Sequence, residues 1–246
     1  MFGINNKPYI KLDQHIDAQL QNLELLKKDV AIGIAQVLAK KTGIDEYENF
    51  RDYVYPNEFE NMKSYQKISN FGPDKDIEHE ISFLNKREKQ IFYKMFYGLY
   101  PTINYICIKD VPEWVAMMDH DDSAYFTSVK EWANTLPFKE IKVIRLIVNE
   151  PGVKTLMHTD YDHAHINKMK SENSSPRIKE SIYINLFNHK KFYIWDQDTD
   201  TKHIINAKAS LWNFADWHGA DASEFPAWSL MIHGRYTDEF RDVVLK

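Results

Sequence analysis

Residues 141–160 read Ile-Lys-Val-Ile-Arg-Leu-Ile-Val-Asn-Glu-Pro-Gly-Val-Lys-Thr-Leu-Met-His-Thr-Asp. The β-branched run at 141–148 predicts a strand, and Glu150-Pro151-Gly152 predicts the turn that follows it. His158 and Asp160 stand two positions apart at the edge of the next β segment. Side chains of a strand alternate between its two faces, so these two side chains point the same way. One imidazole nitrogen and one carboxylate oxygen therefore converge beyond the turn.

The remainder of the C-terminal half shows the same sequence pattern, in which short apolar runs are separated by turn residues. Runs rich in Val, Ile and aromatic residues predict six to eight short strands, and hence a small antiparallel barrel or jelly roll. They lie at 141–148, 181–187, 192–195, 204–206, 210–214 and 228–233. A further aromatic-rich run ends at Trp217-His218, sixty residues after His158. It supplies a second histidine to the same half of the chain.

The N-terminal half is mainly helical in its pattern. Apolar residues three and four apart predict a helix over 12–41 that stops at Gly43. Further helices are predicted over 77–99, from Val111 and over 123–136, with a short strand at 105–109. No sharp change of composition divides the chain. We therefore expect one α+β domain over 1–246, in which a helical scaffold (1–136) packs against the β core (137–246).

Composition excludes several classes of function. The net charge is −5 with a pI of about 6.1, and no basic stripe is present, so we expect no nucleic-acid partner. The single cysteine, Cys107, allows neither an intrachain disulfide nor a thiolate metal site, which favours the cytoplasm. No window approaches the roughly 18 apolar residues of a membrane span, and no signal peptide is recognisable, so we expect no membrane association.

Two histidines and one carboxylate form the ligand set of facial-triad Fe(II) centres, which leave coordination positions open. His158, Asp160 and His218 supply that set. In the alternative interpretation, His158 and Asp160 hydrogen-bond each other at a barrel rim and His218 is a buried histidine with a polar partner. The polar insert at 161–176 is either a lid over the site, which we favour, or a disordered loop. Its histidines, His163 and His165, are either additional ligands or solvated side chains.

The order of strand, Pro-Gly turn, His-x-Asp, further strands and distal histidine resembles the Fe(II)- and 2-oxoglutarate-dependent oxygenases. Pro151-Gly152 six residues before His158, and the run Ser181-Ile-Tyr-Ile-Asn-Leu186, resemble more narrowly the aspartyl/asparaginyl β-hydroxylase and proline hydroxylase branch. The resemblance covers roughly 137–235. It implies a double-stranded β-helix core of the jelly-roll, cupin-like type, with iron held by His158, Asp160 and His218.

The resemblance also implies the reaction. 2-Oxoglutarate and dioxygen would be cosubstrates, and decarboxylation of 2-oxoglutarate to succinate would accompany hydroxylation of a substrate carbon. The substrate expected from this branch is an amino-acid side chain in a protein, a peptide or a free amino acid. The enzyme would thus be an oxidoreductase of the dioxygenase class.

The binding residues for 2-oxoglutarate depart from the pattern of the resembling families. Those families place an arginine about ten residues after the distal histidine, with Ser or Thr two residues further on. Ser229 is present here, but Ala227 or Trp228 stands in place of the arginine.

Other cations are therefore candidates for the distal carboxylate of 2-oxoglutarate. Arg235 would point to the same face of its strand as Ser229. Lys179 and Tyr183 share a face of the strand after the insert, where some of the resembling proteins place a carboxylate-binding lysine and a tyrosine, so both are candidates. Arg145 and Arg177 are further candidates.

Two other functions fit the sequence. The missing arginine favours a cupin-like metalloenzyme that does not use 2-oxoglutarate, such as an isomerase or another dioxygenase. A non-catalytic β-sandwich module for binding or assembly is the third possibility, with the N-terminal helices mediating oligomerisation. A homodimer through those helices is also compatible with the enzyme.

Overall fold

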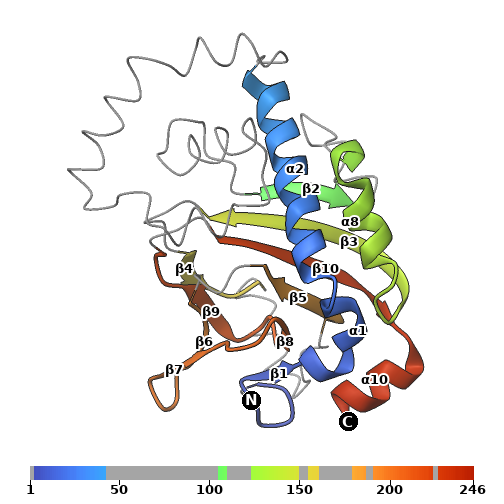
Figure 1. Ribbon diagram of the computed structural model, residues 1–246. Coiled ribbons are helices and arrows are strands. Elements are labelled where there is room, and N and C mark those ends of the chain that lie inside the picture. The colour runs from blue at the N-terminus through green and yellow to red at the C-terminus, as the bar shows by residue number, and fades with distance from the viewer. Residues whose placement is uncertain are drawn as a thin grey trace, which may run out of the picture.

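The computed structural model describes residues 3–42, 105–109, 123–149, 155–160, 179–186, 191–223 and 227–246. These residues form two antiparallel β-sheets with a few helices (Figure 1). The larger sheet has the strand order β1-β8-β5-β10-β3-β2, and the smaller has the order β4-β9-β6-β7. The helices predicted over 77–99 and from Val111, and the predicted lid at 161–176, lie outside the described residues.

The strands are β1 (Tyr9–Lys11), β2 (Tyr105–Lys109), β3 (Phe138–Asn149), β4 (Thr155–His158), β5 (Ser181–Asn185), β6 (Phe192–Asp196), β7 (Thr201–Ile204), β8 (Ala209–Trp212), β9 (Trp217–Ala220) and β10 (Ala227–Tyr236). The α-helices are α1 (Asp17–Leu20), α2 (Leu23–Thr42), α8 (Thr127–Ala133) and α10 (Asp238–Leu245), and the 3₁₀ helices are η1 (Asp13–His15) and η2 (Ser123–Phe126).

Successive strands of the C-terminal half pass back and forth between the two sheets. β3, β5, β8 and β10 belong to the larger sheet, whereas β4, β6, β7 and β9 belong to the smaller one. All described pairings are antiparallel. Eight strands divided in this way between two facing sheets form a jelly roll. The antiparallel β core predicted from the sequence is confirmed, and β1 and β2 extend the edges of its larger sheet.

The larger sheet buries both of its faces. In β5, Ile182 and Ile184 point to one face and share an apolar core with Val30 and Ile34 of α2, which crosses that sheet in Figure 1. Tyr183 points to the opposite face, where a second core lies between the sheets. Because neighbouring side chains of a strand point to opposite faces, one strand serves both cores. We call the face that carries Tyr183 the inner face.

Several predicted boundaries were wrong. The helix expected over 12–41 is divided into η1, α1 and α2, and α2 begins only at Leu23. Asp13 accepts a hydrogen bond from the Ala209 N–H at 2.7 Å, which holds the start of this segment against β8. The strand expected at 204–206 lies instead at Thr201–Ile204, where β7 pairs with β6. The first boundary is set by a contact with a distant strand and the second by pairing within the β6–β7 hairpin, and both contacts override the local pattern.

Candidate metal centre

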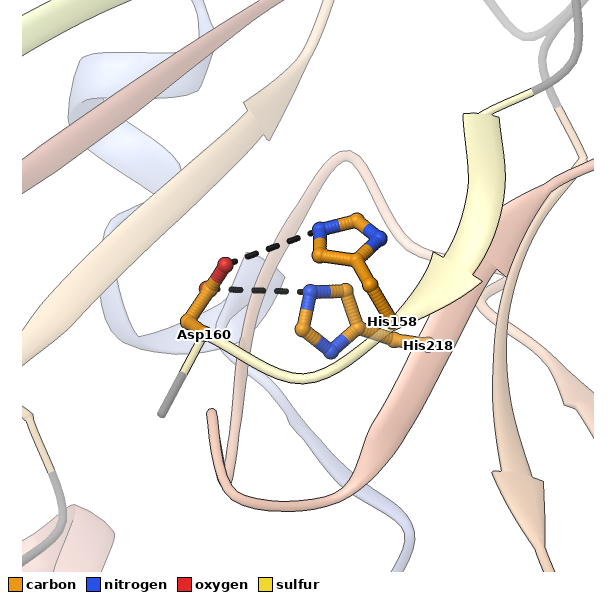
Figure 2. Close-up of side chains that lie close together, drawn as sticks. All are labelled: His158, Asp160 and His218. Atoms are coloured by element: carbon orange, nitrogen blue, oxygen red, sulfur yellow. Dashed lines mark ion pairs between the residues drawn. The ribbon is translucent and has the colours of Figure 1, made fainter. Parts of the chain in front are cut away.

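The three predicted ligands come from β4, the edge strand of the smaller sheet, from the chain just after it, and from the neighbouring strand β9. His158 is the last residue of β4, and the pairing of β4 with β9 places it directly opposite His218. Asp160 follows two residues later, and its backbone N–H donates to the Phe214 carbonyl at 3.0 Å. This bond holds the chain after β4 against the loop that leads into β9. Figure 2 shows the Asp160 carboxylate facing both imidazole rings.

The distances within the triad suit a metal ion better than direct hydrogen bonds. His158 Nε2 lies 3.6 Å from Asp160 Oδ1, and His218 Nε2 lies 3.6 Å from Asp160 Oδ2. Both separations exceed the usual hydrogen-bond length of about 2.7–3.2 Å. One ligand atom from each residue lies within 4.8 Å of the others. Metal bonds of about 2.1 Å separate neighbouring ligands by about 3 Å, so small side-chain rotations would close the triad around an ion.

Access to the triad is one-sided. The side chain of His218 is 3% exposed, whereas those of Asp160 and His158 are 30% and 46% exposed. An ion held here would be shielded on the His218 side. Its remaining coordination positions would face the open side, where exogenous ligands can reach it.

Asp160 is suited to be an anionic ligand. Burial raises the pKa of its carboxyl, but the neighbouring His218, His158 and Lys179 outweigh that effect and hold the pKa below its ordinary value. The carboxylate is therefore ionised at neutral pH. A metal ligand has to be deprotonated, and this one needs no further proton loss on binding.

His218 is oriented by one carbonyl within an aromatic wall. The rings of Phe192, Trp212 and Phe214 lie 5.7, 5.9 and 6.4 Å from its ring, centroid to centroid. Its Nδ1 lies 2.9 Å from the Asp216 carbonyl oxygen. A carbonyl can only accept, so Nδ1 carries the proton and Nε2 presents its lone pair to the triad. This is the arrangement in which metal-binding histidines are usually held.

Two of the residues predicted to contact 2-oxoglutarate lie together on the inner face. Tyr183 and Ser229 are both buried, and they occupy diagonal positions because β10 pairs Met231 with Tyr183 and Ser229 with Asn185. Burial raises the pKa of Tyr183 to about 12, an effect that the nearby Ser229 hydroxyl partly opposes. The phenol is thus neutral at physiological pH and can donate a hydrogen bond.

The predicted cations are placed very differently. Lys179 lies with its Nζ 5.5 Å from the centroid of the Phe214 ring and close enough to act on Asp160, so it belongs to the surroundings of the triad. Arg235 is exposed on β10 opposite Glu140, about 20 Å along the strand from Ser229. The structure does not bring Arg235 together with Tyr183 and Ser229. Arg145 is half-buried on β3 opposite Met231. Arg177, His163 and His165 lie outside the described residues.

Besides Ser229, the inner face carries polar groups that were not predicted from the sequence. Buried side-chain atoms without a hydrogen bond of normal geometry include Asn185 Oδ1, Ser210 Oγ, Trp212 Nε1 and Ser229 Oγ. Strand parity and pairing place all four side chains on the same face as Tyr183. We call this group the polar floor. Unpaired buried polar atoms cost about 1–3 kcal/mol each, so a ligand that supplied partners would be stabilised there.

The period-two pattern of β5 could have revealed part of this floor. Asn185 stands two positions after Tyr183 and therefore points to the same face of β5, as a polar residue on an otherwise apolar strand. Ser210 and Trp212 gave no comparable signal, because both are ordinary residues in a buried strand.

Comparison with known proteins gives matches of low sequence identity to solved structures. No family model and no curated protein sequence matches the chain. A Pseudomonas putida prolyl-4-hydroxylase structure is 12% identical, with a TM-score of 0.31 over 54% of this chain and 71% of that chain. A viral collagen prolyl hydroxylase from Paramecium Bursaria Chlorella virus-1, in complex with 2OG, is 10% identical, with a TM-score of 0.28 over 55% and 79% of the two chains.

A 2OG-Fe(II) oxygenase family oxidoreductase from Burkholderia pseudomallei is 14% identical, with a TM-score of 0.28 over 49% of this chain. The match spans about half of that protein, 54% of its length. Since these TM-scores lie below 0.5, we infer neither the fold nor the function of this chain from them. Separately, no helix among the described residues is both long and apolar enough to cross a membrane.

Proposed function

We propose that this chain is an Fe(II)- and 2-oxoglutarate-dependent dioxygenase that hydroxylates an amino-acid side chain in a protein, a peptide or a free amino acid. The observation that carries the proposal is the convergence of His158, Asp160 and His218 at the open edge of a jelly roll. Three protein ligands on one side leave room for a bidentate 2-oxo acid and dioxygen. Iron bound there would supply the redox chemistry that couples decarboxylation of 2-oxoglutarate to oxidation of a C–H bond.

The chain's own residues would bind and orient the cosubstrate. Lys179 is the predicted cation that lies in the surroundings of the triad, and we propose that it attracts a carboxylate of 2-oxoglutarate. Tyr183 and Ser229 would donate hydrogen bonds from the inner face, and the polar floor around them would receive further polar groups. The aromatic wall behind His218 would exclude water from that side of the metal.

The direct test is succinate release. Aerobic incubation of the purified protein with Fe(II), 2-oxoglutarate and a panel of amino acids and peptides should release succinate, and His158→Ala or Asp160→Ala should abolish it. His15→Ala is the matched control, because His15 packs beside Phe240 of α10 and is not part of the triad. The proposal would be contradicted if the purified protein bound no metal and released no succinate with any candidate substrate after Fe(II) was added.

A second candidate function is a cupin-like metalloenzyme that does not use 2-oxoglutarate. The observation in its favour is that Ala227 and Trp228, both buried, stand where the resembling families have an arginine. Calorimetry separates the two functions. Mn(II)-loaded protein should bind 2-oxoglutarate if the first proposal is correct, and should bind the metal but no 2-oxoglutarate if the second is.

We also propose a domain organisation, a location in the cell and an oligomeric state for this protein. We propose that residues 1–246 form one domain in which the helical part serves as a scaffold for a double-stranded β-helix, and that the protein acts in the cytoplasm. The core shared by α2 and the larger sheet supports the first of these. A homodimer through the N-terminal helices is testable by light scattering on the full chain.

A further inference from the structure

The Asp216 carbonyl that orients His218 belongs to a loop with its own internal hydrogen bonds. The Asp216 N–H donates to the Asn213 carbonyl at 2.9 Å, and the Ala215 N–H donates to Asn213 Oδ1 at 3.1 Å. The side chain of Asp216 is buried, so its carboxylate has to find its hydrogen-bond donors within the protein.

One such donor comes from the other end of the chain. The Gly3 N–H donates to Asp216 Oδ2 at 2.8 Å in a buried contact between residues 213 positions apart. Gly3 precedes a tight hairpin in which Ile4 and Lys7 exchange backbone hydrogen bonds of 2.8 and 2.9 Å. Asn5 and Asn6 have φ of 52° and 62°, as a type I′ turn requires. We call Gly3–Lys7 the N-terminal hairpin.

The N-terminal hairpin is itself anchored. Ile4 is 1% exposed and belongs to the apolar core that also contains α2. Gly3 has φ of 75°, and a Cβ added there would lie 2.1 Å from the Lys7 carbonyl oxygen. Only glycine therefore fits at the position that presents its N–H to Asp216.

We propose that the N-terminal hairpin positions the distal histidine of the metal centre. By binding the Asp216 carboxylate, Gly3 fixes the loop whose Asp216 carbonyl sets the orientation and tautomer of His218. Gly3 and Asp216 are positioning residues in this proposal. Asp216 contacts His218 only at Nδ1, on the far side of the ring from the Nε2 that would bind the metal, and Gly3 acts through Asp216. The inference rests on the proposed metal site but not on the identity of the cosubstrate.

The test measures metal affinity, not catalysis. Mn(II) titration of the metal-free full chain by calorimetry should show a loss of affinity for Asp216→Ala. The variant keeps the backbone carbonyl but releases the loop that aims it at His218, so the loss should be at most about 10- to 100-fold, which is the cost of removing an outer partner of a metal ligand. Asp216→Asn keeps an oxygen acceptor for the Gly3 N–H and should retain most of the affinity. Gly3→Ala should weaken binding, and the double variant should lose no more than Asp216→Ala alone, because both changes break one contact.

Asp13→Ala is the matched control. Asp13 also joins the N-terminal segment to the β core through a carboxylate and a backbone N–H, but its partner is Ala209. This variant should lower the melting temperature and leave the Mn(II) affinity unchanged. If Asp216→Ala does not fold by circular dichroism, Gly3→Ala decides the question.

The outcomes distinguish this inference from the proposed function. Wild-type affinity in both folded Asp216→Ala and Gly3→Ala would overturn the positioning role and leave the metal site standing. A wild-type protein that binds no Mn(II) would overturn the metal site and the positioning role together. An equal loss in Asp13→Ala would show that general loosening of the N-terminal segment, and not the Gly3 contact, lowers the affinity.

Discussion

At the scale of single residues, the inner face is unusual for combining deep burial with unpaired polar atoms. Tyr183 is 2% exposed, and its pKa of about 12 means that it keeps its proton at any pH at which the protein would be assayed. Its hydroxyl can therefore donate to an anionic ligand but cannot act as an anion itself. A buried tyrosine that stays neutral can donate a hydrogen bond to a carboxylate without repelling it.

Tyr183→Phe is expected to weaken 2-oxoglutarate binding and not metal binding. Loss of a hydrogen bond to a charged group costs about 1.5–3 kcal/mol, which corresponds to about 10- to 150-fold in affinity. Calorimetry of Mn(II)-loaded protein with 2-oxoglutarate measures this change. The effect should be independent of pH between 6 and 9, since the phenol stays neutral across that range by its pKa of about 12.

Tyr236→Phe provides the control for this variant. The Tyr236 hydroxyl is also buried, but it donates to the Ser181 carbonyl, and the residue belongs to the core beneath the helices. It should lose stability with unchanged 2-oxoglutarate affinity. Equal losses of ligand affinity in the two variants would contradict a specific role for Tyr183.

At the scale of the elements, the pairing of β4 with β9 creates the metal centre. This pairing is tight at Gly219, where an added Cβ would lie 2.9 Å from the Thr155 carbonyl oxygen and 2.8 Å from the Tyr193 hydroxyl. The absence of a side chain lets β4 approach β9 closely. His158 and His218 come within reach of Asp160 as a consequence of that approach.

Gly219→Ala is expected to force the two strands apart. The strain should lower the free energy of unfolding by about 1–3 kcal/mol and weaken Mn(II) binding at the same time. Chemical denaturation and metal titration measure the two effects. Adding Tyr193→Phe to this variant removes one of the two close contacts and should recover part of both losses. Unchanged metal affinity in Gly219→Ala would show that the close approach of β4 to β9 is not required for metal binding.

At the scale of the whole molecule, the triad exists only in the folded chain. His158 ends β4 and Asp160 follows it, whereas His218 lies on β9, after the four further strands β5 to β8. An ion bound to all three side chains therefore binds the native state and not the unfolded chain. By mass action such an ion stabilises the fold.

Metal should accordingly raise the melting temperature. At a free Mn(II) concentration of about 100 times the dissociation constant, the gain is about 2.7 kcal/mol, or about 5–10 °C for a chain of this size. A chelator should reverse the shift. Scanning calorimetry of His158→Ala and Asp160→Ala should show no metal-dependent shift, while His15→Ala should keep it. A shift of equal size in the triad variants would place the metal elsewhere.

Local patterns were enough to predict some elements of this protein. The β-branched and aromatic run around Ile182, Tyr183 and Ile184 predicts the strand that the structure contains, and the three-and-four spacing of Val30, Ile34 and Val37 predicts the helix. His158 and Asp160 were predicted to converge because their spacing matches the period of a strand. Each of these predictions depends only on neighbours within about eight residues, where backbone geometry fixes the side-chain directions.

Tertiary structure alone decided the rest. The register of β4 against β9, the separation of Arg235 from Ser229, the gathering of Ser210 and Trp212 in the polar floor and the contact of Gly3 with Asp216 all join distant segments. Such contacts depend on how loops and sheets bring strands together, and no local periodicity encodes that. The sequence by itself determined the alternation of the strands and the His-x-Asp pair. The packing of two sheets decided which residues surround that pair.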